Sequence, residues 1–417
     1  MIRLLLKNTY FFSVLIFLLG MISCKSQIKE KEAGSNLNES QIEQNEIIVG
    51  ANNIESYLPL LKGKKIAVVA NQTSVIFKDK RSKTKDQRLF NHLVDSLIAL
   101  KINVQKVFSP EHGFRGKADA GEIVVDGKDT KTGLPIVSLY GKNKKPSQEQ
   151  LKDIDIVVFD IQDVGVRFYT YLSTLHYVME ACAEAEIPVI VLDRPNPNGH
   201  YIDGPTLEIE HKSFLGMHPV PLVYGMTIGE YAQMINGENW LKDNLKCELT
   251  VMPIQNYSHD SSYSLSIRPS PNLPNDKAIN LYPSLGFFEG TTINAGRGTE
   301  MQFQVYGAPF FPKSDFTYTP KSNFGSKYPK HKEKLVNGVD LSGKETLSDI
   351  NLEWFIDAYN KTPKDQEFFG ATFTVHAGTK KLQKQIENGF TQEQIKQTWQ
   401  KDLEIFKKIR EKYLIYK

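Results

Sequence analysis

The sequence of 417 residues is poor in cysteine and in net charge. Its three cysteines, Cys24, Cys182 and Cys247, are too few for a disulfide framework or a cysteine-rich zinc site. Lysine and arginine number 51 and aspartate and glutamate number 48, so the formal net charge is only +3. Attraction to nucleic acid needs a strongly basic face, so this balance argues against a nucleic-acid partner. The hydrophobic content of 40% indicates a globular protein rather than a disordered or multi-span membrane protein.

Several nucleotide-binding and catalytic motifs are also missing. The first predicted strand is not followed by G-x-G-x-x-G, and no G-x-x-x-x-G-K-[ST] loop occurs, so we expect no nucleotide partner. Neither a G-x-S-x-G elbow nor an H-E-x-x-H helix occurs, which removes the usual support for a serine hydrolase or a zincin. No residue pattern demands a metal, and we expect the protein to work without a cofactor.

The N-terminus has the pattern of an export signal. Basic residues precede the apolar segment Phe11–Leu19, which is too short for a comfortable bilayer span. Ser23 followed by Cys24 resembles the end of a bacterial lipoprotein signal, and an ordinary signal peptide with an incidental cysteine is the alternative. We predict a signal peptide over residues 1–23 and lipidation of Cys24. The protein is then an exported lipoprotein of the bacterial cell envelope, anchored to a membrane and facing the periplasm or the cell surface.

The next segment, residues 24–47, contains few large apolar side chains and many Lys, Glu, Ser, Asn and Gln residues. Such a composition cannot bury enough surface to become ordered. We therefore predict a disordered tether between the lipidated cysteine and the folded part of the chain.

From residue 48 onward, short β-branched segments alternate with helical patterns, which favours a parallel sheet covered on both faces. Residues 48–205 are accordingly predicted to form a Rossmann-like α/β domain, and Cys182 falls in one of its apolar helical segments. Residues 206–417 are predicted to form a smaller α+β domain. The predicted strands are Lys65–Ala70, Val104–Phe108, Ile136–Tyr140, Ile154–Phe159, Val189–Leu192, Cys247–Met252 and Ala371–His376, and the predicted helices are Gln87–Leu100, Phe168–Glu186, Met226–Asn236 and two within Gln383–Tyr416.

Polar residues follow the strands of the first domain. In open parallel sheets, ligands bind beyond the carboxyl ends of the strands, so these residues are predicted to surround a site. Glu111, His112 and Asp163 are the candidate catalytic residues among them. The candidate substrate-binding residues from the same loops are Asn71, Arg115, Gln162, Arg167 and Asn196.

Glu111 is the strongest catalytic candidate. It lies on a glycine-flanked loop, S-P-E-H-G-F-R-G, directly after a predicted strand. A carboxyl group in a partly buried position can act as a general acid at neutral pH. The alternative is a loop glutamate that only bonds to its own turn. For His112 we favour a supporting role, while Asp163 is a second carboxylate, a metal ligand or a helix cap.

A second cluster lies in the other predicted domain. Arg297 is flanked by two glycines in A-G-R-G-T, and Glu300 follows three residues later. Flanking glycines allow close approach of the backbone, and a guanidinium suits bidentate binding of a carboxylate or phosphate. The alternative explanation of the glycines is a hairpin turn.

Five segments together resemble the exo-β-N-acetylmuramidases of the NamZ type, a family of bacterial glycoside hydrolases. They are S-P-E-H-G-F-R-G, D-I-Q-D-V-G-V-R-F-Y-T-Y, L-D-R-P-N-P-N-G, Y-G-M-T-I-G-E-Y-A and L-Y-P-S-L-G-F-F-E-G-T-T-I-N-A-G-R-G-T. The resemblance covers residues 48–417. It implies a Rossmann-like domain joined to a smaller domain, with the active site in the cleft between them. His200 departs from the pattern, because a second glycine commonly follows Asn-Pro-x-Gly.

The resemblance implies that Glu111 is the catalytic glutamate and that the enzyme releases N-acetylmuramic acid from the non-reducing ends of peptidoglycan fragments. Muropeptides or disaccharides would be its substrates, and their lactyl carboxylate would suit Arg297, Arg115 or Arg167. Glycoside hydrolysis usually needs two carboxyl groups. Asp163, Glu300 and Glu289 remain open as the second, as does attack by the substrate's own acetamido group.

Two other functions remain open. One is a glycosyltransferase-like or phosphoryl-handling protein, against which the missing phosphate loop argues. The other is a non-catalytic lipoprotein that binds muropeptides, which would keep the arginines and tolerate the loss of Glu111.

Overall fold

The computed structural model describes residues 46–81, 88–116, 122 and 126–417. The predicted signal peptide, Cys24 and almost all of the predicted tether lie outside these residues. Residues 47–417 form one compact unit. Among the described residues, no helix combines the length and apolar character needed to cross a membrane.

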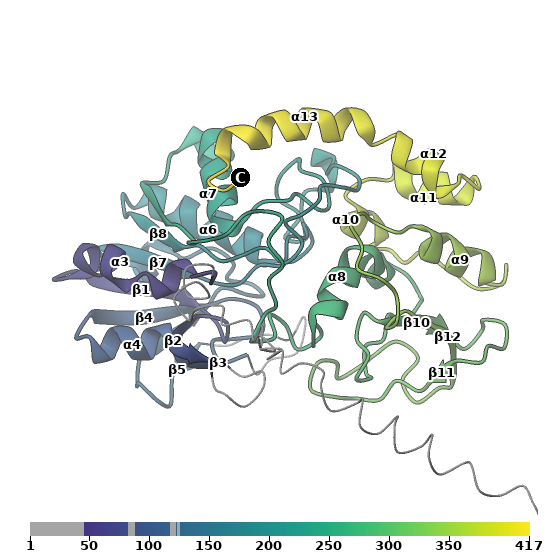
Figure 1. Cartoon of the computed structure of the whole chain (residues 1–417), viewed down its shortest axis with the longest axis horizontal. Coiled ribbons are helices and arrows are strands. Elements are labelled where there is room, and N and C mark those ends of the chain that lie inside the picture. Colours follow the sequence, from purple (N-terminus) through teal and green to yellow (C-terminus); the bar gives the residue numbers. More distant parts are fainter. Residues whose placement is uncertain (1–45, 82–87, 117–121, 123–125) are drawn as a thin grey trace, which may run out of the picture. The chain divides into compact units, whose positions relative to one another are not determined.

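The core of the first half is a seven-stranded sheet with the order β5-β6-β4-β1-β7-β8-β9 (Figure 1). All neighbouring strands pair in parallel except β5, which is antiparallel to β6. This confirms the predicted Rossmann-like α/β class. The strands are β1 Lys65–Ala70, β4 Asn103–Ser109, β5 Gly127–Lys128, β6 Pro135–Ser138, β7 Ile156–Asp160, β8 Val189–Leu192 and β9 Leu249–Met252.

Side chains of β1 alternate between two hydrophobic cores, one on each face of the sheet. Ile66, Val68 and Ala70 belong to the core that contains helices α3 and α4. Ala67 and Val69 belong to the larger core on the side of α6 and α7, which continues into the second half of the chain. The helices of this half are α3 Ile54–Leu61, α4 Leu93–Ala99, α5 Gln148–Leu151, α6 Tyr171–Glu184 and α7 Ile228–Gly237.

The second half is built on a three-stranded antiparallel sheet with the order β10-β12-β11, accompanied by short helices (Figure 1). Its strands are β10 Val305–Ala308, β11 Thr317–Tyr318 and β12 Val336–Asp340. Its helices are α8 Asp276–Leu285, the 3-10 helix η4 Gly286–Gly290, α9 Glu353–Lys361, α10 Phe373–Ala377, α11 Lys381–Glu387, α12 Gln392–Gln397 and α13 Gln400–Arg410.

The chain then returns to the first half, where α13 leads back toward α7 (Figure 1). The Tyr416 hydroxyl donates to Asp193 Oδ2 at 2.6 Å, and Glu230 accepts from the backbone amides of Ile415 and Tyr416. The C-terminal residues therefore help to hold the two halves together.

Several predicted elements differ from the structure. Part of the predicted helix Gln87–Leu100 is strand β3, Arg88–His92, which pairs with β2, Val75–Arg81. The predicted strand Ala371–His376 is helix α10, and the C-terminal region forms three helices rather than two. Strand β9 extends the large sheet, so the sheet continues beyond the predicted domain boundary at residue 205. Thr227 and Thr391 are the N-caps of α7 and α12, each within a capping box.

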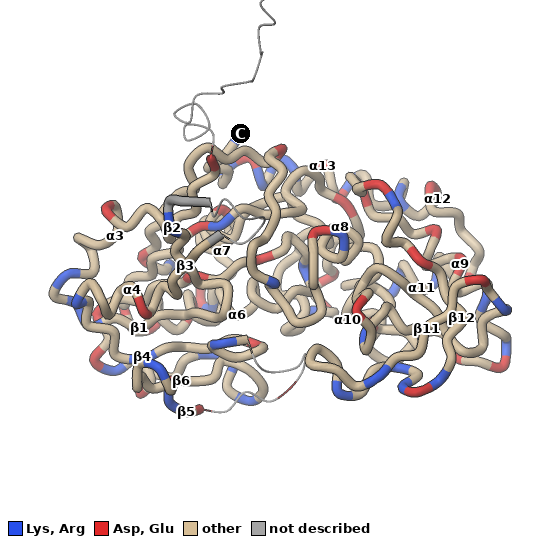
Figure 2. Tube along the Cα trace, turned by 60° about the horizontal axis from the view of Figure 1, so that its bottom comes forward, with Lys and Arg blue, Asp and Glu red and all other residues tan. Residues whose placement is uncertain are grey.

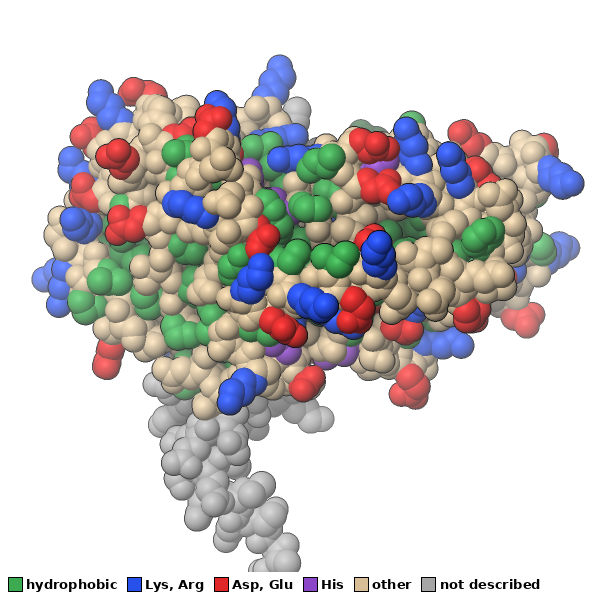
Figure 3. Space-filling model, turned by 90° about the horizontal axis from the view of Figure 1, so that it is seen from above, with side chains coloured by type: hydrophobic (Ala, Val, Ile, Leu, Met, Phe, Trp, Pro, Cys, Tyr) green, Lys and Arg blue, Asp and Glu red, His purple; other side chains and the backbone are tan. Residues whose placement is uncertain are grey.

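Charged residues of both signs are interspersed along the chain (Figure 2) and over the face seen in Figure 3. Cys182 and Cys247 are both buried and unpaired, as expected for a core cysteine at position 182.

Candidate active site

The loops that follow β1, β4 and β7 meet at the carboxyl edge of the large sheet. The strand order reverses beside β1, because the chain runs from β1 outward to β4 and β6 and then crosses to β7, β8 and β9 on the other side. Such a reversal is where sheets of this kind bind ligands. The loops are tied to one another: Ser74 Oγ donates to the backbone oxygen of Asp160, and the Gln162 amide donates to Thr73 Oγ1 at 3.0 Å. The predicted meeting of these loops is therefore present in the structure.

Glu111 follows β4 and is partly exposed. Its Oε2 accepts a hydrogen bond of 2.7 Å from Thr170 Oγ1, at the start of α6. It also interacts with the hydroxyl of Tyr140, whose pKa is raised by burial and by the negative charge of Glu111. The carboxyl group is thus oriented from two sides while still reachable from solvent.

His112 has a positive φ of 70° and is buried behind Glu111. Its Nε2 lies 3.3 Å from Ser270 Oγ, in the proline-rich loop that follows residue 267. The same loop accepts a hydrogen bond of 2.8 Å from the Tyr169 hydroxyl at Pro269 O. His112 therefore connects the Glu111 loop to this wall of the site, which agrees with a supporting role.

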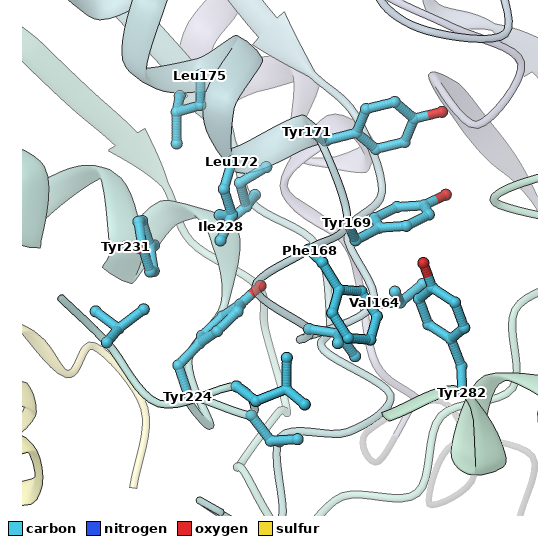
Figure 4. Close-up of a cluster of buried hydrophobic side chains, with 14 of the residues drawn as sticks. Val164, Phe168, Tyr169, Tyr171, Leu172, Leu175, Tyr224, Ile228, Tyr231 and Tyr282 are labelled. Carbon is cyan, nitrogen blue, oxygen red and sulfur yellow. The ribbon is translucent and has the colours of Figure 1, made fainter. Parts of the chain in front are cut away.

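The segment Phe168–Tyr171 links the Glu111 loop to the second half of the chain. The ring centroids of Phe168 and Tyr282 are 5.2 Å apart, and those of Tyr169 and Tyr282 are 6.2 Å apart. Figure 4 shows the hydroxyls of Tyr169, Tyr171 and Tyr282 on the same side of this aromatic cluster. Because Thr170 lies in the same segment, the site includes groups from both halves.

Arg297 forms an ion pair on the second half of the chain. Its Nε and Nη2 lie 2.9 and 2.8 Å from Glu289 Oε2, and its guanidinium lies 5.2 Å from the centroid of the Phe303 ring. Burial would raise the pKa of Glu289, but the charges of Arg297 and Lys330 outweigh it and hold that pKa at about 2. Glu289 is therefore ionised at neutral pH, and the three side chains together carry a net positive charge.

Asp163 is buried and braces its own loop. Its Oδ2 accepts from the Gly165 amide at 2.7 Å and from the Tyr224 hydroxyl, while its Oδ1 is buried without a hydrogen-bond partner among the described residues. Burial raises its pKa to about 6, against the effect of the Tyr224 hydroxyl. Neither oxygen is open to solvent in this geometry. Glu300, in contrast, is exposed.

Two of the predicted substrate-binding arginines are occupied within the protein. Arg115 makes a bidentate contact with Asp129, at 2.7 and 3.2 Å, and reaches Asp95 at 3.2 Å. Arg167 is buried and donates to the backbone oxygens of Pro205, Val220 and Ala377, and burial lowers its pKa to about 9. Their predicted binding of a substrate carboxylate has no support in this geometry. Both arginines instead hold parts of the chain together through these contacts.

The remaining predicted binding residues are amides that hold loops. Gln162 Nε2 donates to the backbone oxygens of Asp163 and Pro195, and Asn196 Nδ2 donates to that of Met226. Asn71 Oδ1 accepts from the amide and the hydroxyl of Thr73. Substrate binding by these three residues stays a prediction.

The sequence did not single out Thr170, Tyr140, Tyr282 or Lys330. Thr170 and Tyr282 lie in two of the motifs already noted, and a hydroxyl-rich F-Y-T-Y segment after a strand end was the available signal. Tyr140 lies at the end of the predicted strand Ile136–Tyr140, so its position was a signal of the same kind, whereas Lys330 carried none.

Metal ligands do not gather around Glu111 in the described part of the chain. Elsewhere among the described residues, one group of three side chains has possible ligand atoms within 4.8 Å of one another. It consists of Glu208, Glu210 and His211. Glu208 already binds Lys381 at 2.6 Å and Thr379 at 2.8 Å.

Two family models match this chain from residue 66 to residue 416, with a gap of two residues between them. Residues 66–277 match the N-terminal part of the exo-β-N-acetylmuramidase NamZ, and residues 280–416 match its C-terminal part. The chain belongs to the NamZ family. It is 39% identical over 384 residues to the peptidoglycan β-N-acetylmuramidase NamZ of Bacillus subtilis, covering 87% of this chain and 89% of that protein.

Two crystal structures of Bacteroides fragilis proteins from the DUF1343 family have the same fold as this NamZ-family chain. One superposes with a TM-score of 0.79 at 45% identity and covers 89% of this chain and 99% of its own. The other superposes with a TM-score of 0.73 at 29% identity and covers 89% of this chain and 100% of its own. The junction between the two family models, near residue 278, lies after β9 and so agrees with the extent of the large sheet.

Proposed function

We propose that this chain is an exo-acting glycoside hydrolase that releases N-acetylmuramic acid from the non-reducing ends of peptidoglycan fragments. Membership of the NamZ family across both halves of the chain supports this activity. A role in cell-wall recycling follows from the same proposal.

Glu111 is the proposed general acid. The observation that carries this assignment is the placement of its carboxyl group at the carboxyl edge of the sheet, where Thr170 and Tyr140 orient it. In the reaction, Glu111 donates its proton to the glycosidic oxygen as the bond from that oxygen to C1 of the sugar breaks. C1 is then attacked by water, whose proton passes to a second carboxylate, or by the acetamido oxygen of the substrate. In the second case water opens the ring that forms and gives its proton to the ionised Glu111.

Arg297 is the proposed partner of the lactyl carboxylate. This carboxylate distinguishes N-acetylmuramic acid from N-acetylglucosamine, so an enzyme specific for the former needs a positive group beside the sugar. Arg297 and Lys330 together outweigh the single negative charge of Glu289. A guanidinium held by an ion pair and an aromatic ring loses little freedom when it binds a second carboxylate.

The cellular location is proposed from the sequence. A lipid on Cys24 and a flexible tether would hold the enzyme in the cell envelope, where fragments of the cell wall occur. A membrane is then its second partner.

Replacing Glu111 tests the catalytic assignment. Glu111→Gln keeps the shape of the side chain and removes the proton donor, so turnover should fall by about 10²- to 10⁴-fold while muropeptide binding survives. Glu55→Gln, which changes an exposed carboxylate on α3, is the matched control. Undiminished hydrolysis by Glu111→Gln would remove Glu111 from the mechanism.

A further inference from the structure

Tyr282 has a largely buried ring, and its hydroxyl forms no hydrogen bond with any residue that the structure describes. Its side chain belongs to α8 and is only 9% exposed. None of the residues that the structure describes forms a hydrogen bond with its hydroxyl, whereas the neighbouring Tyr169 hydroxyl donates to Pro269 O at 2.8 Å. The Tyr282 hydroxyl is not among the fully buried unpaired atoms of the described residues, so it stays accessible and a ligand in the site can reach it.

The position of Tyr282 lies between the two functional groups proposed above. On one side its ring packs against Phe168, two residues before the Thr170 that holds Glu111. On the other side it packs edge-on against Phe303 at 4.7 Å, and the Arg297 guanidinium lies over that same ring. The charges of both Glu111 and Arg297 act on the Tyr282 hydroxyl. Burial raises the pKa of Tyr282, so the hydroxyl keeps its proton and can donate it in a hydrogen bond.

The order of substituents on the sugar matches this order of residues. In N-acetylmuramic acid, C1 carries the scissile oxygen, C3 carries the lactyl ether, and C2 lies between them with the acetamido group. With Glu111 at C1 and Arg297 at the lactyl carboxylate, the residue between them faces C2. We propose that the Tyr282 hydroxyl donates a hydrogen bond to the carbonyl oxygen of the 2-acetamido group. This inference rests on the proposed function, and it makes Tyr282 a determinant of specificity for 2-acetamido sugars.

The test compares Tyr282→Phe with a matched control. Tyr201→Phe removes a hydroxyl that likewise has no hydrogen-bond partner among the described residues, but this hydroxyl is fully buried and a sugar cannot reach it. The hydroxyl of Tyr201 is influenced by Asp203 and Asp349 rather than by Glu111. Each variant is assayed for hydrolysis of an aryl β-N-acetylmuraminide and for inhibition by two sugars. These are N-acetylmuramic acid and 3-O-lactylglucose, which has a hydroxyl in place of the acetamido group.

Tyr282→Phe should weaken inhibition by N-acetylmuramic acid about tenfold, as expected for one lost hydrogen bond, and should leave inhibition by 3-O-lactylglucose unchanged. It should also lower kcat/KM for the aryl muraminide, while Tyr201→Phe changes neither quantity. The assignment of Tyr282 would be overturned if Tyr282→Phe weakened inhibition by both sugars equally, or weakened inhibition by neither. If the wild type hydrolyses no muraminide, the proposed function fails; if it binds neither sugar, both proposals fail.

Discussion

The hydrogen bond from Thr170 to Glu111 should be worth a measurable part of the catalytic rate. Thr170→Val removes the hydroxyl that lies 2.7 Å from Glu111 Oε2 and keeps a branched side chain of similar volume. Thr170 is the N-cap residue of α6, but its side chain makes no capping hydrogen bond, so the helix should persist. A hydrogen bond to a charged group contributes about 1.5–3 kcal/mol. At about 1.36 kcal/mol per factor of ten, its loss should lower kcat about 10- to 150-fold.

The assay is steady-state hydrolysis of an aryl β-N-acetylmuraminide. Release of the aryl group gives the rate at each substrate concentration, from which kcat and KM are obtained separately. Thr170 acts by positioning Glu111, so KM should change little, and Thr170→Ser should restore most of kcat. Thr174→Val is the matched control, since its buried hydroxyl lies one turn along α6 and, among the described residues, hydrogen-bonds only to Thr170 O, at 3.4 Å. Wild-type kcat in Thr170→Val, or an equal loss in Thr174→Val, would refute the reasoning.

Three other predictions concern charge and location. Arg297→Lys keeps the charge but loses the forked donor, so KM for muraminides should rise at least about tenfold with a smaller effect on kcat; an unchanged KM would contradict lactyl recognition by Arg297. The pKa of Glu289 is held at about 2, below its ordinary 4.5. Its ion pairing therefore contributes about 3 kcal/mol to the free energy of unfolding. This contribution is present above pH 4.5 and is lost as the pH falls toward 2. Urea unfolding between pH 7 and pH 3 should therefore show a shallower loss of stability in Glu289→Gln than in the wild type, and parallel curves would contradict the pairing. Metabolic labelling with palmitate should mark the wild type and not Cys24→Ser, whereas an unlabelled wild type would exclude the lipid anchor.

The sheet could be predicted from the sequence because its strands are short, apolar and β-branched. Lys65–Ala70 and Val189–Leu192 match β1 and β8 residue for residue. The predicted strand at Ala371–His376 was wrong because a short apolar segment has no clear period. Its buried residues, Phe373 and Ala377, are four apart, which is the spacing of one helical face.

The meeting of the loops at the site was predictable in the same way, since the carboxyl ends of parallel strands share one edge of the sheet. The partners of individual side chains were not. Arg115 is paired with Asp95 and Asp129, and Arg167 donates a hydrogen bond to the backbone of helix α10, about 210 residues later. Contacts of this kind depend on tertiary packing, so the sequence indicated chemically suitable arginines without indicating which were already occupied.

The central claim is that this chain removes N-acetylmuramic acid from non-reducing ends, and substrate discrimination by the purified protein, residues 25–417, tests it most directly. A synthetic β-N-acetylmuraminide and the matching β-N-acetylglucosaminide differ only in the lactyl group. The account predicts that the first is hydrolysed and the second is not. Hydrolysis of neither by folded protein, or equal hydrolysis of both, would contradict it.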